Sequence, residues 1–586
     1  MNDTSPKHLA NDLSVQTSIH RLPVEILDDV ASYISKKSLL VAVCVCRSWN
    51  AAFSPLLYKS VEINSSKMCE LLLTTLATAT TQKHLGHHVR KLDIRYALKR
   101  PEISHLVRLC PFLGEIAAIT SGADDYIPLL PQWHYLKRIS LHLHGQSPLM
   151  LPAGFLQKRL THLVLTIDDF SEWIAGMPLL PAIEDLTIYF RFKWKSGGWI
   201  QIDDLERLHE ALPHLQSLTL EDVGISGEIP EQVVPCRTLR NLSLKWYSGY
   251  LWGQYFSQKY TNLETLTLSK HPLMYTTDVK LEILSLASSC RYLKKLTMNG
   301  REDYQFFLSI LQTIQAPLTN ITSYSHNSNA WFLKAIRSFR QSLSTVYIQE
   351  RLGTGIADAL TALKACSSLV DLRLECYNHD FEIDRMLEGL NRLKHLTVKG
   401  NRILVSGSCT NNMYHHLIDL TMRGTNIDKK VYHYLSQHCP RLHSLDCQYS
   451  FIAPRAVQQR NCLKQSYSIY YPNPNLKSLN IDCREEVLLA LTMAQKSQAS
   501  EPPRASRGAQ WYHGKKNRVG RLNATEVPAV MGEASDEKGV FTAIGCQESK
   551  ARSNKHPFPI DIPIVYVHCH KVEEIYLNET NLFYIE

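Results

Sequence analysis

A short apolar pattern recurs along most of this chain of 586 residues. In the stretch "LIDLTMRGTNIDKKVYHYLSQHCPRLHSLD", Leu417, Leu420 and Met422 follow the spacing L-x-x-L-x-L, and a turn and a helical pattern through Val431 and Leu435 come next. Leucines at this spacing on a strand point to one side, where a single unit cannot bury them. We therefore expect successive strands to stack in parallel and to share one apolar core.

The pattern returns at nearly constant steps, most of them 23 to 26 residues long. This period and internal spacing are typical of the leucine-rich repeat. In an α/β domain without repeats, so many apolar segments at a regular spacing would be a coincidence. We predict an α/β solenoid, with a curved parallel sheet that has an open concave face and with helices and irregular segments on the convex side. The predicted repeats begin at Val89, Leu113, Leu136, Leu160, Ile183, Leu215, Leu239, Leu263, Leu293, Leu318, Leu343, Leu369, Leu393, Leu417, Leu442 and Leu476.

Several of the 15 cysteines keep the phase of the repeat. One cysteine per repeat lacks the spacing of zinc ligands, so we expect small buried core residues and no metal site. His568 and His570 are only a weak indication of a metal site, and we expect no metal there either. The cysteines that lie three residues before a repeat's first leucine are Cys110, Cys236, Cys290, Cys366 and Cys439.

An amphipathic pattern near the start of the chain stands apart from the repeats. In "LPVEILDDVASYI", residues 22–34, apolar side chains follow helical spacing behind Leu22 and Pro23. A second stripe through Leu39 and Val43 leads into a third short helix that contains Trp49. Such short helices are marginal alone in water, so their apolar stripes must pack on their own chain or on a partner.

This segment resembles the F-box over about 40 residues, from Ile19 to Tyr58. The resemblance rests on L-P-x-E-I-L, the V-C-x-C-R-x-W run and the following P-L-L-Y, in that order. It implies docking on the Skp-type adaptor of a cullin-RING ubiquitin ligase. A three-helix cap that only shields the first repeat is the alternative, but the stripes offer more apolar surface than such a cap can bury. The expected adaptor-binding residues are Leu22, Pro23, Glu25, Ile26, Leu27, Val30, Leu39, Val43 and Trp49.

The chain divides by pattern into six parts. A disordered tail (1–18) precedes the F-box (19–60), a linker helix (61–84) and the solenoid (85–495). Residues 496–556 are polar, without periodicity, and we predict a disordered basic insertion there. At residues 557–586 the repeat resumes through Ile575 and Leu577, which predicts a C-terminal cap.

Composition excludes several classes of function. The net charge of +9 is largely concentrated in the insertion, which argues against a dedicated nucleic-acid binder. No apolar run approaches the roughly 20 residues that span a bilayer, and the N-terminus has neither the basic nor the apolar region of a secretory signal. We expect a cytoplasmic and/or nuclear protein. The common motifs of hydrolases, nucleotide-binding proteins and metalloproteases are missing, so we expect no catalytic residue and no cofactor.

Two aromatic stretches, "YFRFKWKSGGW" and "KWYSGYLWGQYF", follow strand leucines of neighbouring repeats. Aromatic and arginine side chains are typical of binding hot spots, although long loops also need small aromatic cores of their own. The candidate substrate-binding residues are Tyr189, Arg191, Trp194, Trp246, Tyr247 and Trp252.

Together the two patterns resemble the F-box and leucine-rich-repeat proteins, with the Cys-containing repeat subtype. The resemblance implies a non-catalytic substrate receptor of a Skp-cullin-F-box ubiquitin ligase, which binds an unknown protein substrate through its repeats. A repeat scaffold without a ligase role is the alternative, and a nucleic-acid-associated protein that uses the basic insertion is a third possibility.

Overall fold

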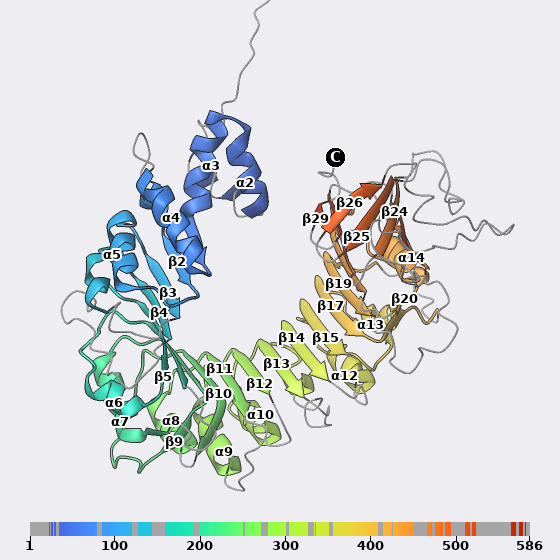
Figure 1. The fold of residues 1–586 in the computed structure, drawn as a ribbon. Coiled ribbons are helices and arrows are strands. Elements are labelled where there is room, and N and C mark those ends of the chain that lie inside the picture. The colour runs from blue at the N-terminus through green and yellow to red at the C-terminus, as the bar shows by residue number, and fades with distance from the viewer. Residues whose placement is uncertain are drawn as a thin grey trace, which may run out of the picture. The chain divides into compact units, whose positions relative to one another are not determined.

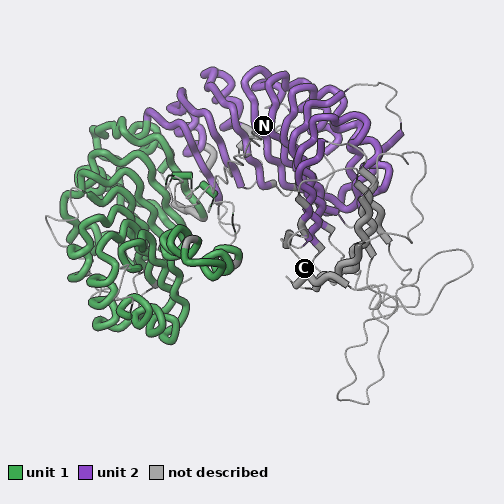
Figure 2. Tube along the Cα trace, turned by 90° about the horizontal axis from the view of Figure 1, so that it is seen from above, with its two compact units in different colours: residues 1–260 green, residues 261–586 purple. Residues whose placement is uncertain are grey.

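The computed structural model gives the chain's backbone in segments and divides it into two compact units, residues 1–260 and 261–586 (Figure 2). For some positions within these segments, among them most of those after 482, only the backbone is described. The described positions are 23, 25–26, 29–30, 34, 36–78, 85–119, 127–142, 159–190, 199–249, 252–270, 279–299, 304–325, 333, 336–350, 356–407, 414–424, 426–449, 466–471, 475–483, 487–493, 510–515, 518–522, 564–569, 574–577 and 580–581.

The first unit begins with helices and continues as alternating strands and helical segments (Figure 1). Its helical segments are α2 (Lys36–Val45), α3 (Arg47–Lys59), α4 (Ser66–Thr78), η2 (Leu85–His88), α5 (Arg100–Leu109), η4 (Ile127–Gln132), α6 (Phe170–Ala175), α7 (Ile202–Ala211) and α8 (Trp252–Lys259). Its strands are β1 (Ser60–Ile63), β2 (Lys91–Ile94), β3 (Glu115–Ile119), β4 (Arg138–His142), β5 (His162–Ile167), β6 (Asp185–Phe190), β7 (Trp199–Gln201), β8 (Ser217–Glu221), β9 (Gly224–Ser226) and β10 (Asn241–Gly249).

The strands of the first unit form a parallel ladder in chain order. Each strand from β1 to β5 pairs with the next, β6 pairs with β8, and β8 pairs with β10. The short strands β7 and β9 form a second parallel ladder that joins the end of β10. Equivalent repeat positions face each other, as Leu92 faces Ile116. This register stacks the apolar residues of successive strands on one face of the sheet.

The second unit repeats the same arrangement. Its helices are α9 (Val279–Ser289), α10 (Tyr304–Thr313), α12 (Ile356–Leu363), α13 (Ile383–Leu387) and α14 (Lys429–His438). Its main parallel ladder consists of β11 (Thr265–Lys270), β12 (Lys295–Asn299), β13 (Asn320–Ser325), β14 (Thr345–Glu350), β15 (Asp371–Cys376), β17 (His395–Gly400), β19 (Asp419–Gly424), β21 (Ser444–Tyr449), β23 (Ser478–Cys483) and β28 (Glu574–Leu577), with β29 (Thr580–Asn581) antiparallel to β28.

Two smaller sheets complete the second unit. The short strands β16 (Phe381–Glu382), β18 (Arg402–Leu404) and β20 (Asn426–Ile427) pair in parallel. A mixed sheet has the strand order β22, β27, β24, β25, β26. Its strands are β22 (Ser466–Tyr471), β24 (Val487–Met493), β25 (Gln510–Lys515), β26 (Arg518–Leu522) and β27 (Ile564–Cys569).

The predicted α/β fold class and the phase of the repeat are confirmed. The first apolar residue of every predicted repeat, from Val89 to Leu476, is at most 2% exposed. Of the phase-keeping cysteines, Cys236 is half-buried, and Cys110, Cys290, Cys366 and Cys439 are buried. The strand residues between the leucines lie on the opposite face of each sheet, which we call the open face.

The boundary between the first helices and the sheet differs from our prediction. We predicted a linker helix over 61–84, but β1 occupies Ser60–Ile63 and pairs in register with β2. The helix α4 that follows therefore belongs to a first strand–helix unit. The repeat pattern did not predict this unit, because Tyr58 occupies the position of the first leucine in later units. The same stretch also overlaps the F-box pattern.

The prediction of a disordered insertion over 496–556 is wrong for part of that segment. Strands β25 and β26 lie within it, and β25 pairs antiparallel with both β24 and β26. Lys515 pairs with Arg518, so two residues separate the strands, as in the commonest hairpins. The solenoid boundary at 495 also changes, because β24 belongs to the mixed sheet and not to the main ladder.

No helix in the described ranges is both long and apolar enough to cross a membrane.

Candidate functional site

Helices α2 and α3 pack on each other around a small apolar core. Leu39, Ala42 and Phe53 are buried at its centre. The apolar side chains that pack against this centre are Ile34, Val43, Ala52, Leu56 and Leu57. Residues 39, 42 and 43 recur at helical spacing, so contacts within the chain bury one face of α2.

The opposite face of α2 is also apolar, but it is exposed to solvent. Leu40 is 52% exposed, Val41 67% and Val45 58%. Ile26 and Val30, which precede α2 in the sequence, and Trp49 of α3 are exposed as well. We call this set of exposed apolar side chains the docking patch; it consists of Ile26, Val30, Leu40, Val41, Val45 and Trp49.

The corner between α2 and α3 is fixed by hydrogen bonds. Cys46 has an extended backbone between the helices, and its Sγ accepts a hydrogen bond from the backbone N–H of Trp49 at 3.4 Å. The side-chain amide of Asn50 donates to the carbonyl oxygen of Val43 at 3.0 Å, which satisfies an end of α2. Trp49 and Phe53 meet edge to face, with ring centroids 5.5 Å apart. These contacts hold the Trp49 side of the docking patch in place.

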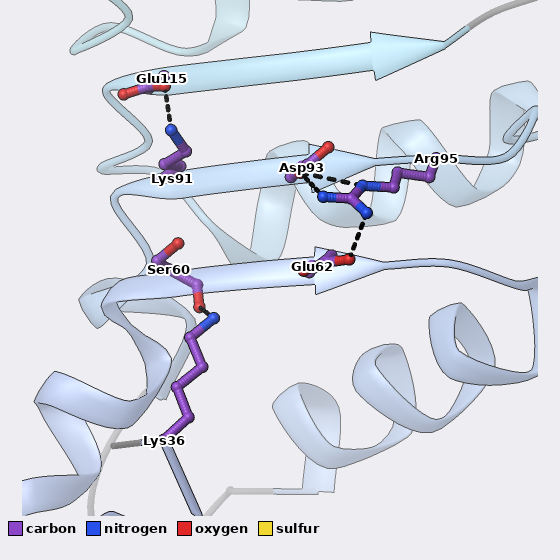
Figure 3. A network of polar contacts seen from close by, with 7 residues as sticks. All are labelled: Lys36, Ser60, Glu62, Lys91, Asp93, Arg95 and Glu115. Carbon is purple, nitrogen blue, oxygen red and sulfur yellow. Dashed lines mark hydrogen bonds and ion pairs between the residues drawn. The ribbon is translucent and has the colours of Figure 1, made fainter. Parts of the chain in front are cut away.

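The helical pair is joined directly to the sheet. Helix α3 ends at Lys59, β1 begins at Ser60, and the backbone N–H of Arg90 donates to the carbonyl oxygen of Lys59 at 3.0 Å. Lys36 at the start of α2 donates to the carbonyl oxygen of Ser60 at 3.4 Å (Figure 3). The docking patch is therefore carried on a support that continues into the repeat unit.

Charged side chains line the open face of the first strands. Arg95 contacts both Glu62 and Asp93 at 3.1 Å, and Lys91 pairs with Glu115 (Figure 3). These side chains are between 30% and 54% exposed, so each pair contributes at most about 1 kcal/mol to stability. The network orders the open face, but the buried leucines hold the strands together.

The predicted adaptor-binding residues divide into three groups. Pro23, Glu25, Ile26, Val30 and Trp49 are exposed. Leu22 and Leu27 lie outside the described residues. Leu39 is only 5% exposed and Val43 is half-buried against the same core, so the prediction that they face the adaptor is wrong for Leu39 and unsupported for Val43.

Sequence reasoning missed Leu40, Val41 and Val45. Helix α2 has the sequence "KKSLLVAVCV", in which apolar residues surround the whole helix. Such a pattern marks a helix that is covered on all sides, and no periodicity selects which face the chain itself covers. These residues could have been found because α2 has more apolar positions than one buried face requires.

The candidate substrate-binding residues do not form one described patch. Tyr189 is half-buried on the open face of β6, opposite Glu221 of β8. Trp252 is 1% exposed and packs near Phe256, so its assignment to a binding surface is wrong. Trp246 and Tyr247 lie in β10, where their side chains are not described, and Arg191 and Trp194 lie outside the described residues.

The described part of the chain holds no cluster of three or more His, Cys, Asp or Glu side chains arranged to bind a metal ion. Burial raises the pKa of the Cys110, Cys290 and Cys439 thiols to about 12. These thiols stay protonated at neutral pH and are poor nucleophiles. The exposed docking patch is therefore the feature of the described residues that most suggests function.

Comparison with known proteins supports this choice of site. Residues 19–64 match the family model described as F-box-like, and this range ends just after β1. No curated protein matches the chain. The helical pair, its docking patch and the first strand thus lie within an F-box-like domain at residues 19–64.

Proposed function

We propose that the chain is the substrate-recognition subunit of a Skp-cullin-F-box type ubiquitin ligase. Its F-box-like domain docks a Skp-type adaptor, its strand–helix repeats bind a protein substrate, and the substrate is then ubiquitylated and degraded by the proteasome. The chain itself performs no chemistry in this role, since ubiquitin transfer belongs to other subunits.

The observation that carries the proposal is the two-sided apolar character of α2. Leu39 and Ala42 already fill the core, yet Leu40, Val41 and Val45 remain more than half exposed on the other face. Complete burial of a valine or leucine side chain contributes roughly 1.5–3 kcal/mol. A partner that covers these three side chains therefore gains several kcal/mol of binding free energy, before the cost of association.

The direct connection between α3 and β1 supports the second half of the proposal. An adaptor bound to the docking patch would hold the first strands of the repeat unit in a fixed orientation, because no flexible linker intervenes. A ligase needs such rigidity to present the substrate's lysines at a constant distance from the transferring subunit.

The test is co-purification of the chain with a recombinant Skp-type adaptor. We expect Val41→Asp to weaken binding about tenfold or more, because the complex would bury an unpaired carboxylate. Val234→Asp is the matched control: Val234 is 66% exposed against 67% for Val41, but it lies outside the F-box-like domain. Equal adaptor binding by the wild type and Val41→Asp would contradict docking through this patch.

A repeat scaffold without a ligase role is the competing function. A second measurement, made in cells, distinguishes a ligase subunit from a scaffold. After proteasome inhibition, the proteins bound to the wild-type chain are compared with those bound to Val41→Asp. A ligase subunit accumulates ubiquitylated partners only when it binds the adaptor. A scaffold would bind the same partners without ubiquitin, and the wild type and Val41→Asp would bind them equally.

A further inference from the structure

Two neighbouring thiols differ from the other cysteines whose side chains are described. Cys44 and Cys46 are exposed, and Cys236 is half-buried. The remaining described thiols are buried, namely Cys69, Cys110, Cys290, Cys366, Cys376, Cys439 and Cys447. Buried thiols are protected from reagents, so a reagent in solution meets Cys44 and Cys46 first among this set.

Cys44 lies on the same exposed face of α2 as two members of the docking patch. It follows Leu40 by four residues and Val41 by three on α2, so these three side chains share one exposed face of the helix. Its neighbour Val45 is also exposed. A group attached to the sulfur of Cys44 therefore stands over the apolar surface that the proposed adaptor must contact.

Cys46 affects the same patch through the backbone. It occupies the N-cap position of α3, and its Sγ accepts the backbone N–H of Trp49 at 3.4 Å. Caps of this kind satisfy one of the free N–H groups in the first turn of a helix. A bulky group on this sulfur crowds the turn that positions Trp49, which is itself a member of the docking patch.

We propose that Cys44 and Cys46 form a modification site for soft electrophiles of the α,β-unsaturated carbonyl class, and that alkylation there prevents adaptor docking. This inference rests on the proposed function. In the reaction, the thiol releases its proton, and the sulfur bonds to the β-carbon as the carbon–carbon π bond breaks. The α-carbon then takes up a proton, so the reaction is an addition that needs no oxidant or reductant.

The apolar surroundings favour this class of reagent. Leu40, Val41 and Val45 form an exposed apolar surface around Cys44, on which an uncharged, partly apolar electrophile gains contacts before it reacts. A bound adaptor covers the same surface. Modification and docking should therefore exclude each other.

N-ethylmaleimide is a suitable probe, because it carries the same reactive double bond. The full chain is treated with a limiting amount, with and without a saturating concentration of recombinant Skp-type adaptor, and the labelled peptides are mapped by mass spectrometry. We expect Cys44 and Cys46 to be labelled before Cys69, Cys110 and Cys290, and the adaptor to slow their labelling at least tenfold. We also expect complete labelling to lower the adaptor affinity of the free chain at least tenfold.

The variant Cys44→Ser/Cys46→Ser locates the effect, since serine retains an N-cap acceptor at position 46. Its affinity before and after treatment should differ less than twofold. If treatment still abolishes its binding, other thiols are responsible and the inference is overturned. If the untreated wild type binds the adaptor but its thiols stay unprotected and labelling leaves the affinity intact, the inference alone fails. If the untreated wild type does not bind the adaptor, the proposed function itself fails.

Discussion

Val61 of β1 lies opposite Leu92 of β2 in a parallel register, and β1 starts at Ser60, the residue that follows the end of α3. The first strand of the sheet is therefore also the last part of the F-box-like domain. Its core residue Ile63, opposite Ile94, is 1% exposed. Helices and sheet share this strand, so we expect them to unfold together.

The substitution Ile63→Ala tests this cooperativity. It leaves a cavity next to Ile94 and should lower the free energy of unfolding by about 2–5 kcal/mol. Hydrogen exchange should speed up in α3 as well as in β2, because both are joined through β1. The control is Glu62→Ala on the open face of the same strand, with an expected effect below about 1 kcal/mol. Unchanged exchange in α3 after Ile63→Ala would show that the helices fold independently.

Trp252 and Tyr189 should respond differently to truncation. Trp252→Ala removes a buried indole from α8 and should lower the free energy of unfolding by about 3–5 kcal/mol. Tyr189→Ala acts on the half-buried open face of β6, where we expect a loss of about 1 kcal/mol. Urea unfolding followed by circular dichroism measures both. A small loss for Trp252→Ala would return this residue to the list of binding candidates.

The sequence was most informative where one requirement repeats. Each L-x-x-L-x-L segment must bury its leucines against its neighbours, so the period alone placed Leu92, Leu242 and Leu420 in the core. The same reasoning failed at α2, because Leu39 and Leu40 are equally apolar. Only the position of α3 determines which of the two faces the interior.

The two remaining errors have different causes. Trp252 follows a strand within an aromatic run, and hydrophobic composition alone does not distinguish a buried helix from an exposed loop. The hairpin of β25 and β26 lies in a charged, Gly-containing stretch with little alternation, and its pairing with β24 spans a gap in sequence. Pairing between distant segments is decided by tertiary context, which overrides local propensity.

The β25–β26 hairpin should protect β24. Leu489 and Leu491 pair with Tyr512 and Gln510, respectively, so β25 supplies hydrogen-bond partners to the backbone of β24. Replacing residues 508–524 by a short Gly-Ser linker should therefore speed up hydrogen exchange in β24 and leave β15, β17 and β19 unchanged. Replacing 528–544 by the same linker is the control. Slow exchange in β24 after removal of the hairpin would mean that β27 alone protects this strand.

A buried histidine makes the stability of the second unit depend on pH. His415 is 5% exposed, its Nε2 lies 3.0 Å from the hydroxyl of Tyr434, and its backbone N–H donates to the carbonyl oxygen of His438. Burial, and secondly the nearby His438 and His416, lower the pKa of His415 to about 4. The folded state therefore holds this imidazole neutral under conditions in which the unfolded chain protonates it.

We expect this difference to destabilise the second unit in mild acid. The contribution of His415 is fully present above pH 6.5 and is lost as the pH falls from 6.5 toward 4, because the unfolded state binds the proton first. At pH 5 the loss amounts to about 2 kcal/mol for this one group. Urea unfolding at pH 7 and pH 5 measures it: in His415→Gln, the difference between the two pH values should shrink by about that amount, whatever the substitution does to stability at pH 7. The control is His214→Gln, which replaces an exposed histidine by the same residue. An unchanged difference in His415→Gln would mean that other groups take up the proton.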